Sequence, residues 1–469
     1  MCKNKNALSF LLLTLLSMNY FYSQEVSYTY SDLREALYAN NPDILKQSEE
    51  YYRSTLDVLD AWWTLGPTLN ASAVGNYMFN PPSVNYSIDS DEIINSIEWP
   101  EIAGQSTKPN VSNRQIKIDE SLDHTLYSFS LSLKQPLFTW GKITNAIKLY
   151  QGVSEAQRLQ LNITESRLET ELETRLTSLF YLQKILKILE EEYNYASQLV
   201  SFSELAEQNG MMIHQEVLDA KLQAKQIQIA QQNVNEQVST QLLELQKLTR
   251  IQNLSLENID YSFDETLIKQ ITLLDREQVK EKALSSESET IQLLLQTQNL
   301  QDIALKIAKA SVNWKPDIAL QISLGYGGTK FPFFEDGWKD ADDYSLNFTI
   351  GITTSVWDGG NKVRDVSRKL SQQRSAQIES EDAKIQIQHT LDTQWNTVDA
   401  SSLRIEYQDL KIENAHLKIE QQELMYKNGY ASESDVLFAK IDWCNERITR
   451  EQEALNVAVA AYTILYLSK

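Results

Sequence analysis

The turn-forming residues of this 469-residue chain are confined to a few short stretches. Its 14 glycines and 9 prolines all lie within residues 42–152, at Gly210, within residues 316–360, or at Gly429. The stretches that contain neither residue are 153–209, 211–315, 361–428 and 430–469. Because Gly and Pro interrupt helices, this spacing predicts very long helices separated by short non-helical regions. At about 1.5 Å per residue, a helix over 142–208 would extend about 100 Å.

The first 23 residues have the pattern of a secretory signal peptide. Lys3 and Lys5 precede a mostly apolar run from Ala7 to Met18, and a cleavage position follows near Ser23. The run is too short and wrongly flanked for a membrane anchor. Cys2 precedes the apolar run, so it is not placed to carry a lipid after cleavage. We therefore expect an exported protein.

Export changes the charge and the cysteine content of the mature chain. The net charge of −21 becomes −23, because two lysines and no acidic residues leave with residues 1–23. Cys444 remains as the single cysteine, so no internal disulfide can form. The acidity argues against nucleic-acid binding, which needs a basic surface. No later stretch is apolar over the roughly 18 residues that a membrane helix requires.

Four runs in the non-helical regions alternate between apolar and polar residues. They lie at about 67–79, 127–134, 317–326 and 344–353. The clearest places these residues on one face: Ile318, Leu320, Ile322, Leu324 and Tyr326. A period of two over about ten residues is typical of transmembrane β-strands. A soluble sheet with one buried face alternates as well. The spanning length and the small, hydroxyl-rich polar face favour a membrane barrel with a water-filled interior.

Four strands are too few to close a barrel, since about eight is the practical minimum. An open sheet edge in lipid would leave backbone groups without hydrogen-bond partners. The barrel must therefore be shared between subunits, and two copies would supply eight strands and three copies twelve.

The helical segment 361–428 carries two apolar stripes with a seven-residue repeat. One stripe consists of Val398, Ile405, Ile412 and Ile419. The other consists of Leu403, Leu410, Leu417 and Leu424. The stripes are about 140° apart at roughly 100° per residue. A helix with two such seams has a packed neighbour on each side, as in a curved wall of helices. The first half shows a single seam, at Leu179, Leu182, Leu186, Leu189, Tyr193, Ala196 and Val200.

The two halves of the chain are related by a duplication with an offset of 219 residues. PLFTWGK at 136–142 aligns with SVWDGGN at 355–361, and NGMMIHQEVLDAK at 209–221 aligns with NGYASESDVLFAK at 428–440. Each half predicts a helix, two strands, a very long helix, an Asn-Gly break and another long helix. The connection between the two strands is much longer in the first half, at about 80–125, than in the second, at about 329–343.

This duplication, the motifs at both strand exits, NNPDI at 40–44 and YKNGYASESDVLFAK at 426–440 resemble the TolC-like outer-membrane efflux proteins. The resemblance implies a mixed α and β membrane protein that forms a homotrimer. A twelve-stranded transmembrane β-barrel, with four strands per chain, would stand in the outer membrane lipid of a Gram-negative bacterium. It would continue into a long periplasmic α-helical barrel that docks onto a periplasmic adaptor and an inner-membrane pump, for efflux or type I secretion.

The repeats predict the following organisation. After the signal peptide 1–23, the first repeat covers 24–251, with strands at about 67–79 and 125–138 and a hairpin tip at 209–212. The second repeat covers 252–469, with strands at about 317–328 and 344–357 and a tip at 428–431.

The resemblance also implies roles for residues at and near the two tips. The tips would meet the adaptor through Gly210, Met211, Gly429 and Tyr430. Asp435 matches a position that lines the closed periplasmic aperture in the family, and Phe438, one turn further on, departs from the acidic residue found there. Tyr426 and Glu216 match positions of a closed-state latch, whereas the basic partner expected near Ala431 is missing. A simpler reading of Asp435 is a helix-start carboxylate favoured by the helix dipole.

Catalysis and metal binding have no support in the sequence. The histidines are His124, His214, His389 and His416, and none has a metal-ligand spacing to another His or Cys. GYGG at 325–328 lacks the Lys-Ser/Thr of a phosphate loop. We therefore expect no enzyme, cofactor or metal. Two other classes stay open, a passive outer-membrane porin and a periplasmic coiled-coil structural protein.

Overall fold

The computed structural model describes residues 27–98, 101–102, 105–106, 108–110, 112, 114–121, 124–312, 315–328, 344–354 and 357–469. The expected signal peptide at 1–23 and the expected connection at 329–343 lie outside the described residues. The chain forms two compact units, and both units draw on both repeats. We call residues 1–57, 149–302 and 369–469 the helical unit, and residues 58–148 and 303–368 the sheet unit.

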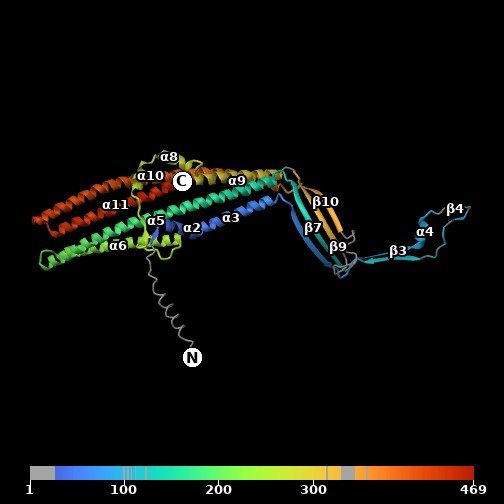
Figure 1. Cartoon of the computed structure of the whole chain (residues 1–469), viewed down its shortest axis with the longest axis horizontal. Coiled ribbons are helices and arrows are strands. Elements are labelled where there is room, and N and C mark those ends of the chain that lie inside the picture. Colours follow the sequence, from blue (N-terminus) through green and yellow to red (C-terminus); the bar gives the residue numbers. More distant parts are fainter. Residues whose placement is uncertain are drawn as a thin grey trace, which may run out of the picture. The chain divides into compact units, whose positions relative to one another are not determined.

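Four helices, which Figure 1 labels, contribute residues to both units. They are α3 (Pro42–Trp63), α5 (Lys142–Gln208), α9 (Glu289–Val312) and α10 (Asn361–Lys427). The remaining long helices are α6 (His214–Thr249) and α11 (Glu433–Leu467), and the short ones are α2 (Tyr30–Asn40), α4 (Ser90–Ser96), α7 (Thr266–Leu273) and α8 (Arg276–Leu284). A two-residue parallel pairing joins β1 (Tyr28–Thr29) to β8 (Ile259–Asp260).

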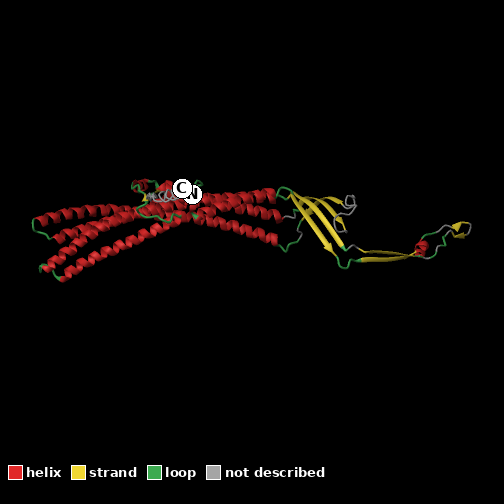
Figure 2. Cartoon of the chain, turned by 60° about the horizontal axis from the view of Figure 1, so that its bottom comes forward, coloured by secondary structure: helices red, strands yellow, loops and turns green. Residues whose placement is uncertain are grey.

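The long helices of the helical unit pack as two hairpins, α5–α6 and α10–α11 (Figure 2). Gln228 of α6 donates to the Tyr193 hydroxyl of α5 at 2.9 Å, and Lys411 of α10 pairs with Glu446 of α11 at 2.6 Å. The hairpins meet through α5 and α11, where Arg447 pairs with Glu191 at 2.7 Å. The order across the unit is therefore α6, α5, α11, α10, with α6 and α10 at the two ends.

The seam predicted in the first half is the core of this unit. Leu179, Leu182, Leu189 and Ala196 are buried in one cluster with Ile227, Val234, Val238 and Leu245 of α6. On α10, Val398 is fully buried against α11 residues near the C-terminus, and Ile419 is 9% exposed. The second α10 seam is uncovered in the single chain, because Leu403, Leu410, Leu417 and Leu424 are 56–68% exposed.

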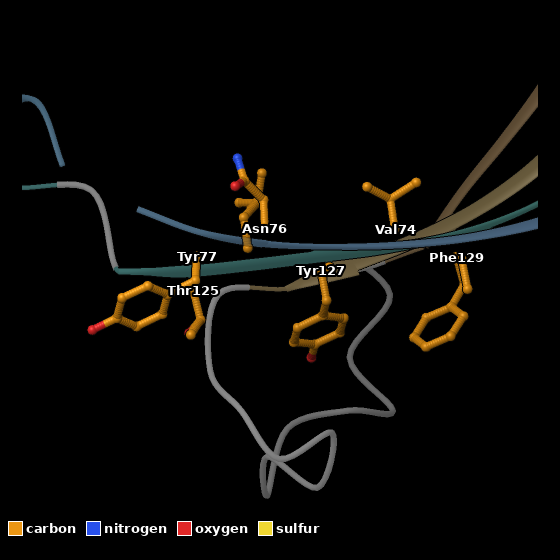
Figure 3. Close-up of a pocket in the computed structure, with 9 residues that line it drawn as sticks. Val74, Asn76, Tyr77, Thr125, Tyr127 and Phe129 are labelled. Atoms are coloured by element: carbon orange, nitrogen blue, oxygen red, sulfur yellow. The ribbon is translucent and has the colours of Figure 1, made fainter. Parts of the chain in front are cut away.

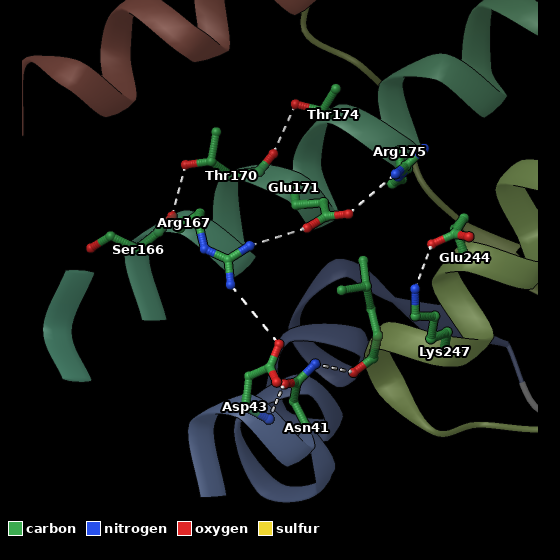
Figure 4. Close-up of polar contacts among 11 residues, drawn as sticks. Asn41, Asp43, Ser166, Arg167, Thr170, Glu171, Thr174, Arg175, Glu244 and Lys247 are labelled. Atoms are coloured by element: carbon green, nitrogen blue, oxygen red, sulfur yellow. Dashed lines mark hydrogen bonds and ion pairs between the residues drawn. The ribbon is translucent and has the colours of Figure 1, made fainter. Parts of the chain in front are cut away.

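The NNPDI motif fastens the start of α3 to the end of α6 (Figure 4). Asn41 is buried, its Nδ2 donates to the carbonyl of Leu248 at 3.0 Å, and its Oδ1 accepts from the amide of Asp43 at 2.9 Å. Arg167 of α5 lies between the carboxylates of Asp43 and Glu171, at 4.0 and 3.8 Å. One asparagine thus caps a helix and satisfies an end carbonyl of another.

The sheet unit contains a four-stranded antiparallel sheet in the order β10-β9-β7-β2. The strands are β2 (Thr68–Tyr77), β7 (Thr125–Phe138), β9 (Asp317–Gly328) and β10 (Tyr344–Thr353). The sequence predicts β2 and β10 at about 67–79 and 344–357, so both strands end earlier than expected. β7 and β9 pair across the two repeats, from Tyr127–Gly328 to Phe138–Ile318.

The connection at 80–125 is not the loop that the sequence predicts. β3 (Ser83–Asp89) and β6 (Gln115–Ser121) form an antiparallel ribbon of seven residue pairs. Beyond it lie α4 and a short pair, β4 (Glu101–Ile102) with β5 (Gln105–Ser106). The alternation in β3 and β6 is short, and the two strands are far apart in sequence, so neither stands out alone.

One carboxylate of the helical core is buried without a cationic partner in the described structure. Glu192 on α5 is 3% exposed, and this burial raises the pKa of its carboxyl to about 7, although a hydrogen bond from Asn445 opposes the shift. Because the pKa is raised above 4.5, the folded state favours the protonated acid. Stability is then highest below about pH 4.5 and falls as the pH rises toward 7.

We expect Glu192→Gln to stabilise the protein at pH 8 by about 3 kcal/mol, since one pKa unit corresponds to about 1.4 kcal/mol. The stabilisation should disappear at about pH 4. Thermal unfolding followed by circular dichroism at both pH values measures it. Glu190→Gln is the matched control, because Glu190 is exposed two residues away. An equal change at both pH values would contradict a titrating Glu192.

Candidate functional site: the hairpin tips, the start of α11 and the open sheet

The two helical hairpins turn with the same backbone geometry. Gly210 and Gly429 have φ angles of 69° and 77°, in the left-handed region where glycine has no Cβ penalty. After them, the amide of Met211 donates to the Ala206 carbonyl at 2.8 Å, and the amide of Tyr430 donates to the Met425 carbonyl at 2.9 Å. This pattern satisfies carbonyls at the end of each helix. The predicted Asn-Gly breaks are therefore helix-ending turns.

An ion pair behind each tip repeats with the same 219-residue offset. Lys221 pairs with Glu204 at 2.8 Å, and Lys440 pairs with Glu423 at 2.9 Å. Each pair joins the two helices of its hairpin near the turn. The alignment of the two repeats pairs Lys221 with Lys440, but it does not include the acidic partners Glu204 and Glu423. Each glutamate lies 17 residues upstream of its lysine, and this shared spacing could have identified them.

The side chains that follow the two glycines are free of packing in the single chain. Met211 is 78% exposed and Tyr430 is 81% exposed. Large apolar side chains at such exposure suit a contact with another protein. Adaptor docking by Gly210, Met211, Gly429 and Tyr430 stays a prediction.

Asp435 begins α11 as a capping residue. Its Oδ2 accepts from the amide and the hydroxyl of Ser432 at 2.8 and 2.7 Å, and its own amide donates back to Ser432 Oγ at 3.3 Å. The hydrogen bonds from Ser432 hold the pKa of Asp435 below its usual value. The helix-start role of Asp435 is thus present in the structure.

The same face of α11 also presents Phe438. Asp435, Phe438 and Asp442 are exposed, whereas Val436 and Leu437 between them are buried. Spacings of three and four residues place the three exposed side chains on one stripe of the helix. The structure therefore brings Asp435 and Phe438 together, and their role as an aperture stays a prediction.

Glu216 is the counterpart of Asp435 in the first repeat. Its Oε2 accepts from the amide of Ile213 at 3.1 Å, in the position where Asp435 accepts from Ser432. Tyr426 is 47% exposed, and no hydrogen bond joins it to Glu216 within this chain, in which both residues are described. A latch between these residues stays a prediction, and within one chain Glu216 serves as a cap.

The four-stranded sheet has one apolar face and one polar face. Two rows across β10, β9, β7 and β2 show the apolar face: Leu346, Leu324, Leu131 and Ala71, and Phe348, Ile322, Leu133 and Leu69. Two rows show the polar face: Ser345, Gly325, Ser130 and Ser72, and Asn347, Ser323, Ser132 and Asn70. On the polar face, the hydroxyls of Ser72 and Ser130 lie 2.8 Å apart.

Aromatic residues gather at the end of the sheet next to the β3–β6 ribbon. Figure 3 shows Tyr77, Tyr127 and Phe129 on one side of the strands and Val74 and Asn76 on the other. The rings of Tyr127, Phe129 and Tyr326 lie 6.0–6.5 Å apart, centroid to centroid. Aromatic rings at the margin of an apolar band are typical of strands that cross a membrane. Among the described residues, β2 pairs only with β7 and β10 pairs only with β9, so these two strands are the edges of the sheet.

Among the described residues, no helix combines the length and the apolar character needed to cross a membrane. The described part of the chain also contains no group of three or more His, Cys, Asp or Glu side chains arranged to hold a metal ion.

Comparison with known proteins agrees with this geometry. The family model described as "Outer membrane efflux protein" matches residues 33–249. The outer membrane protein VceC of Vibrio cholerae is 15% identical, with a TM-score of 0.71 over 94% of this chain and 96% of that chain. A membrane protein of Pseudomonas aeruginosa is 14% identical, with a TM-score of 0.73 over 94% and 93% of the two chains. The CmeC outer membrane channel of Campylobacter jejuni is 14% identical, with a TM-score of 0.69 over 96% and 87%. No curated protein matches the chain.

Proposed function

We propose that this chain, whose residues 33–249 match the model of the outer membrane efflux protein family and whose fold is similar to that of VceC, is one subunit of a trimeric duct of a tripartite efflux or type I secretion system. Substrates enter at the hairpin tips from a periplasmic adaptor and an inner-membrane pump, and they leave through the outer membrane. The chain is an outer-membrane protein with a periplasmic helical domain, and passage of solutes rather than catalysis is its activity.

The observation that carries this proposal is the incomplete sheet. Four strands share one continuous apolar face, and in the described part of the chain each edge strand is paired on one side only. In lipid, each unpaired backbone group costs several kcal/mol, about as much as a lost hydrogen bond in hydrocarbon. Pairing β10 of one copy with β2 of the next removes both edges. The apolar face then meets lipid, and the serine and asparagine rows line the interior.

The exposed seams of the helical unit support the same closure. The α10 seam consists of Leu403, Leu410, Leu417 and Leu424, and it lies at one end of the helix order. At the other end, α6 exposes Leu218, Leu222, Ile229 and Leu243 at 45–61%. A heterologous contact that joins one end of each copy to the other end of the next generates a closed ring. Three copies then build both a twelve-stranded barrel and a helical wall.

In this ring, Asp435 and Phe438 from three subunits converge at the periplasmic end. Three converging carboxylates raise one another's pKa. Within each chain, however, the hydrogen bonds from Ser432 lower the pKa of Asp435. We expect the converging Asp435 carboxylates to attract cations. The three Phe438 rings, one helical turn further on, resist wetting of the constriction.

In planar bilayers at neutral pH, we expect the purified channel to have low conductance and cation selectivity. Divalent or trivalent cations added from the side of the hairpin tips should block it. Asp435→Ala should weaken the block about tenfold, as expected for the loss of about 1.4 kcal/mol of cation attraction. Phe438→Ala should raise the conductance at least twofold, because an apolar constriction is widened.

Ser432→Ala is the control that distinguishes the effect of the Asp435 charge from the effect of the helix cap. It removes the hydroxyl that bonds Asp435, at a typical cost of about 1 kcal/mol, and it keeps the carboxylate. Cation block should therefore survive in Ser432→Ala. If Asp435→Ala leaves the block unchanged, Asp435 is only a helix-start residue, and the constriction lies elsewhere on the second hairpin.

A further inference from the structure

The apolar face of the four-stranded sheet ends, next to the long helices, in a row of three large side chains. Ile352 of β10 pairs with Ile318 of β9, and Ile318 pairs with Phe138 of β7. Ile318 is an even number of residues from Leu324, so this row belongs to the apolar face. A register shift between Pro136 and Phe138 brings Phe138 onto that face. Phe138 is 49% exposed and Ile352 is 67% exposed, so the apolar surface continues to the ends of the strands.

This row lies about one bilayer core away from the aromatic cluster at the other end of the sheet. Ile318 and Tyr326 are eight residues apart on β9, which is about 27 Å at roughly 3.4 Å per residue. Strands of outer-membrane barrels tilt by about 35–45°, so the vertical separation is about 21 Å, close to the roughly 25 Å of a lipid-facing band. Aromatic residues flank such a band at both margins. The row that contains Phe138 therefore marks the second margin.

Trp140 adds a ring beside this row in a backbone conformation that tryptophan rarely adopts. The ring packs edge-on against Phe138, with the centroids 4.8 Å apart, and Nε1 donates to the Pro316 carbonyl at 2.8 Å. The φ of Trp140 is 54°, in the left-handed region. Gly359, which aligns with Trp140 in the second repeat, has a φ of 65°. The turn can thus be made by glycine, and a bulky residue held in this conformation points to a functional position.

A lysine without a carboxylate partner lies over the Trp140 ring. Nζ of Lys315 is 5.3 Å from the ring centroid. No carboxylate among the described residues forms an ion pair with Lys315, whereas Lys142 pairs with Asp317 at 3.0 Å. The Lys142–Asp317 pair is neutral, so Lys315 contributes an uncompensated positive charge beside Trp140. This charge is opposite in sign to the net charge of the chain, −21.

From this cluster we propose that Trp140 and Lys315 bind the head group of an anionic phospholipid at the margin of the sheet next to the long helices. An indole has an apolar body and a polar N–H, which suit the boundary between acyl chains and head groups. The Lys315 ammonium, above the ring, pairs with the lipid phosphate. An anionic lipid fits better than a zwitterionic one, because basic side chains are attracted to a negative lipid surface. The inference rests on the proposed duct, in which the apolar face of the sheet meets lipid.

Native mass spectrometry of the full-length protein in a non-ionic detergent, with equal amounts of phosphatidylglycerol and phosphatidylcholine added, tests this site. The natural protein should retain phosphatidylglycerol preferentially. Lys315→Gln should reduce this preference about fivefold, the factor expected for one basic side chain at an anionic surface. Trp140→Gly should reduce the retention of both lipids, because it removes the ring and keeps a turn that Gly359 also makes. Lys306→Gln is the matched control, because Lys306 of α9 is an exposed lysine nine residues upstream of Lys315.

The same spectra separate a failure of this site from a failure of the proposed duct. If the protein is a trimer and Lys315→Gln keeps the full preference, or Lys306→Gln loses as much, the lipid site is wrong. Unchanged lipid retention in Trp140→Gly would also overturn it. A natural protein that stays monomeric and soluble without detergent would refute the duct, and the lipid site with it. A trimer in which Lys315→Gln loses the preference and Lys306→Gln keeps it supports both.

Discussion

Replacing Leu410 and Leu417 together by glutamate is expected to abolish the trimer while leaving the fold of each subunit intact. Both leucines lie on the exposed α10 seam, 67% and 56% exposed in the single chain, so neither supports the core of its own subunit. In the proposed ring they are buried against α6 of the next copy. Each loses about 1.5–3 kcal/mol of apolar burial, and each new carboxylate adds a desolvation cost of several kcal/mol. Native mass spectrometry in detergent should show monomers in place of trimers.

The control places one carboxylate elsewhere on the same helix. His416 of α10 is exposed and lies outside the leucine seam, so His416→Glu should keep the trimer. Circular dichroism should show the same helix content in both variants. A double leucine variant that remains fully trimeric would show that the second seam does not form the subunit contact, and a monomeric natural protein would refute the shared barrel.

Gly429→Val is expected to reduce export at least tenfold while the trimer persists. The φ of 77° at Gly429 costs a residue with a Cβ roughly 1–2 kcal/mol, and a β-branched side chain fits there least well. A Cβ at this position would meet no atom within 4 Å, so the effect is one of backbone conformation and not of crowding. The turn must change, and Tyr430 then leaves its position. Gly210→Val should act in the same way on Met211, because Gly210 has a φ of 69° and equal space.

Gly429→Asn and Gly210→Asn are the controls, since asparagine adopts the left-handed conformation more readily than other residues. Both should retain most export. Export is measured as resistance or as secreted substrate in cells that contain the matching pump, and trimer content as in the first experiment. Full export in both valine variants would remove the case for docking at the tips. Loss of the trimer would show that the turns stabilise assembly instead.

The helix lengths, the four main strands and the two turns follow from local sequence patterns. A period of two determines which residues of β9 and β10 share a face, because successive side chains of a strand point to opposite sides. Gly210 and Gly429 mark the turns, because few other residues adopt a positive φ. The duplication predicts that the two hairpins turn alike. In the structure, the amides of Met211 and Tyr430 form equivalent hydrogen bonds after the two glycines.

The roles that depend on a distant partner needed the tertiary structure. The α10 sequence predicts two seams, but it cannot say that Val398 is buried against α11 while Leu403 is left exposed. Lys221 and Lys440 occupy equivalent positions in the repeated sequence. Their ion pairs with Glu204 and Glu423 are found only in the structure, where the two helices of each hairpin lie side by side. The resemblance predicts an aperture role for Asp435, and only the structure shows its carboxylate bonded to Ser432.

The sequence by itself determined what depends on neighbours along the chain, namely the long helices, the alternating strands and the glycine turns. The tertiary structure decided what depends on pairing between distant segments. It placed β7 beside β9, and it formed a ribbon from β3 and β6, which have 25 residues between their closest ends. Such pairings are stabilised by contacts that no local pattern records, since strand partners are chosen by register and by burial across the whole fold.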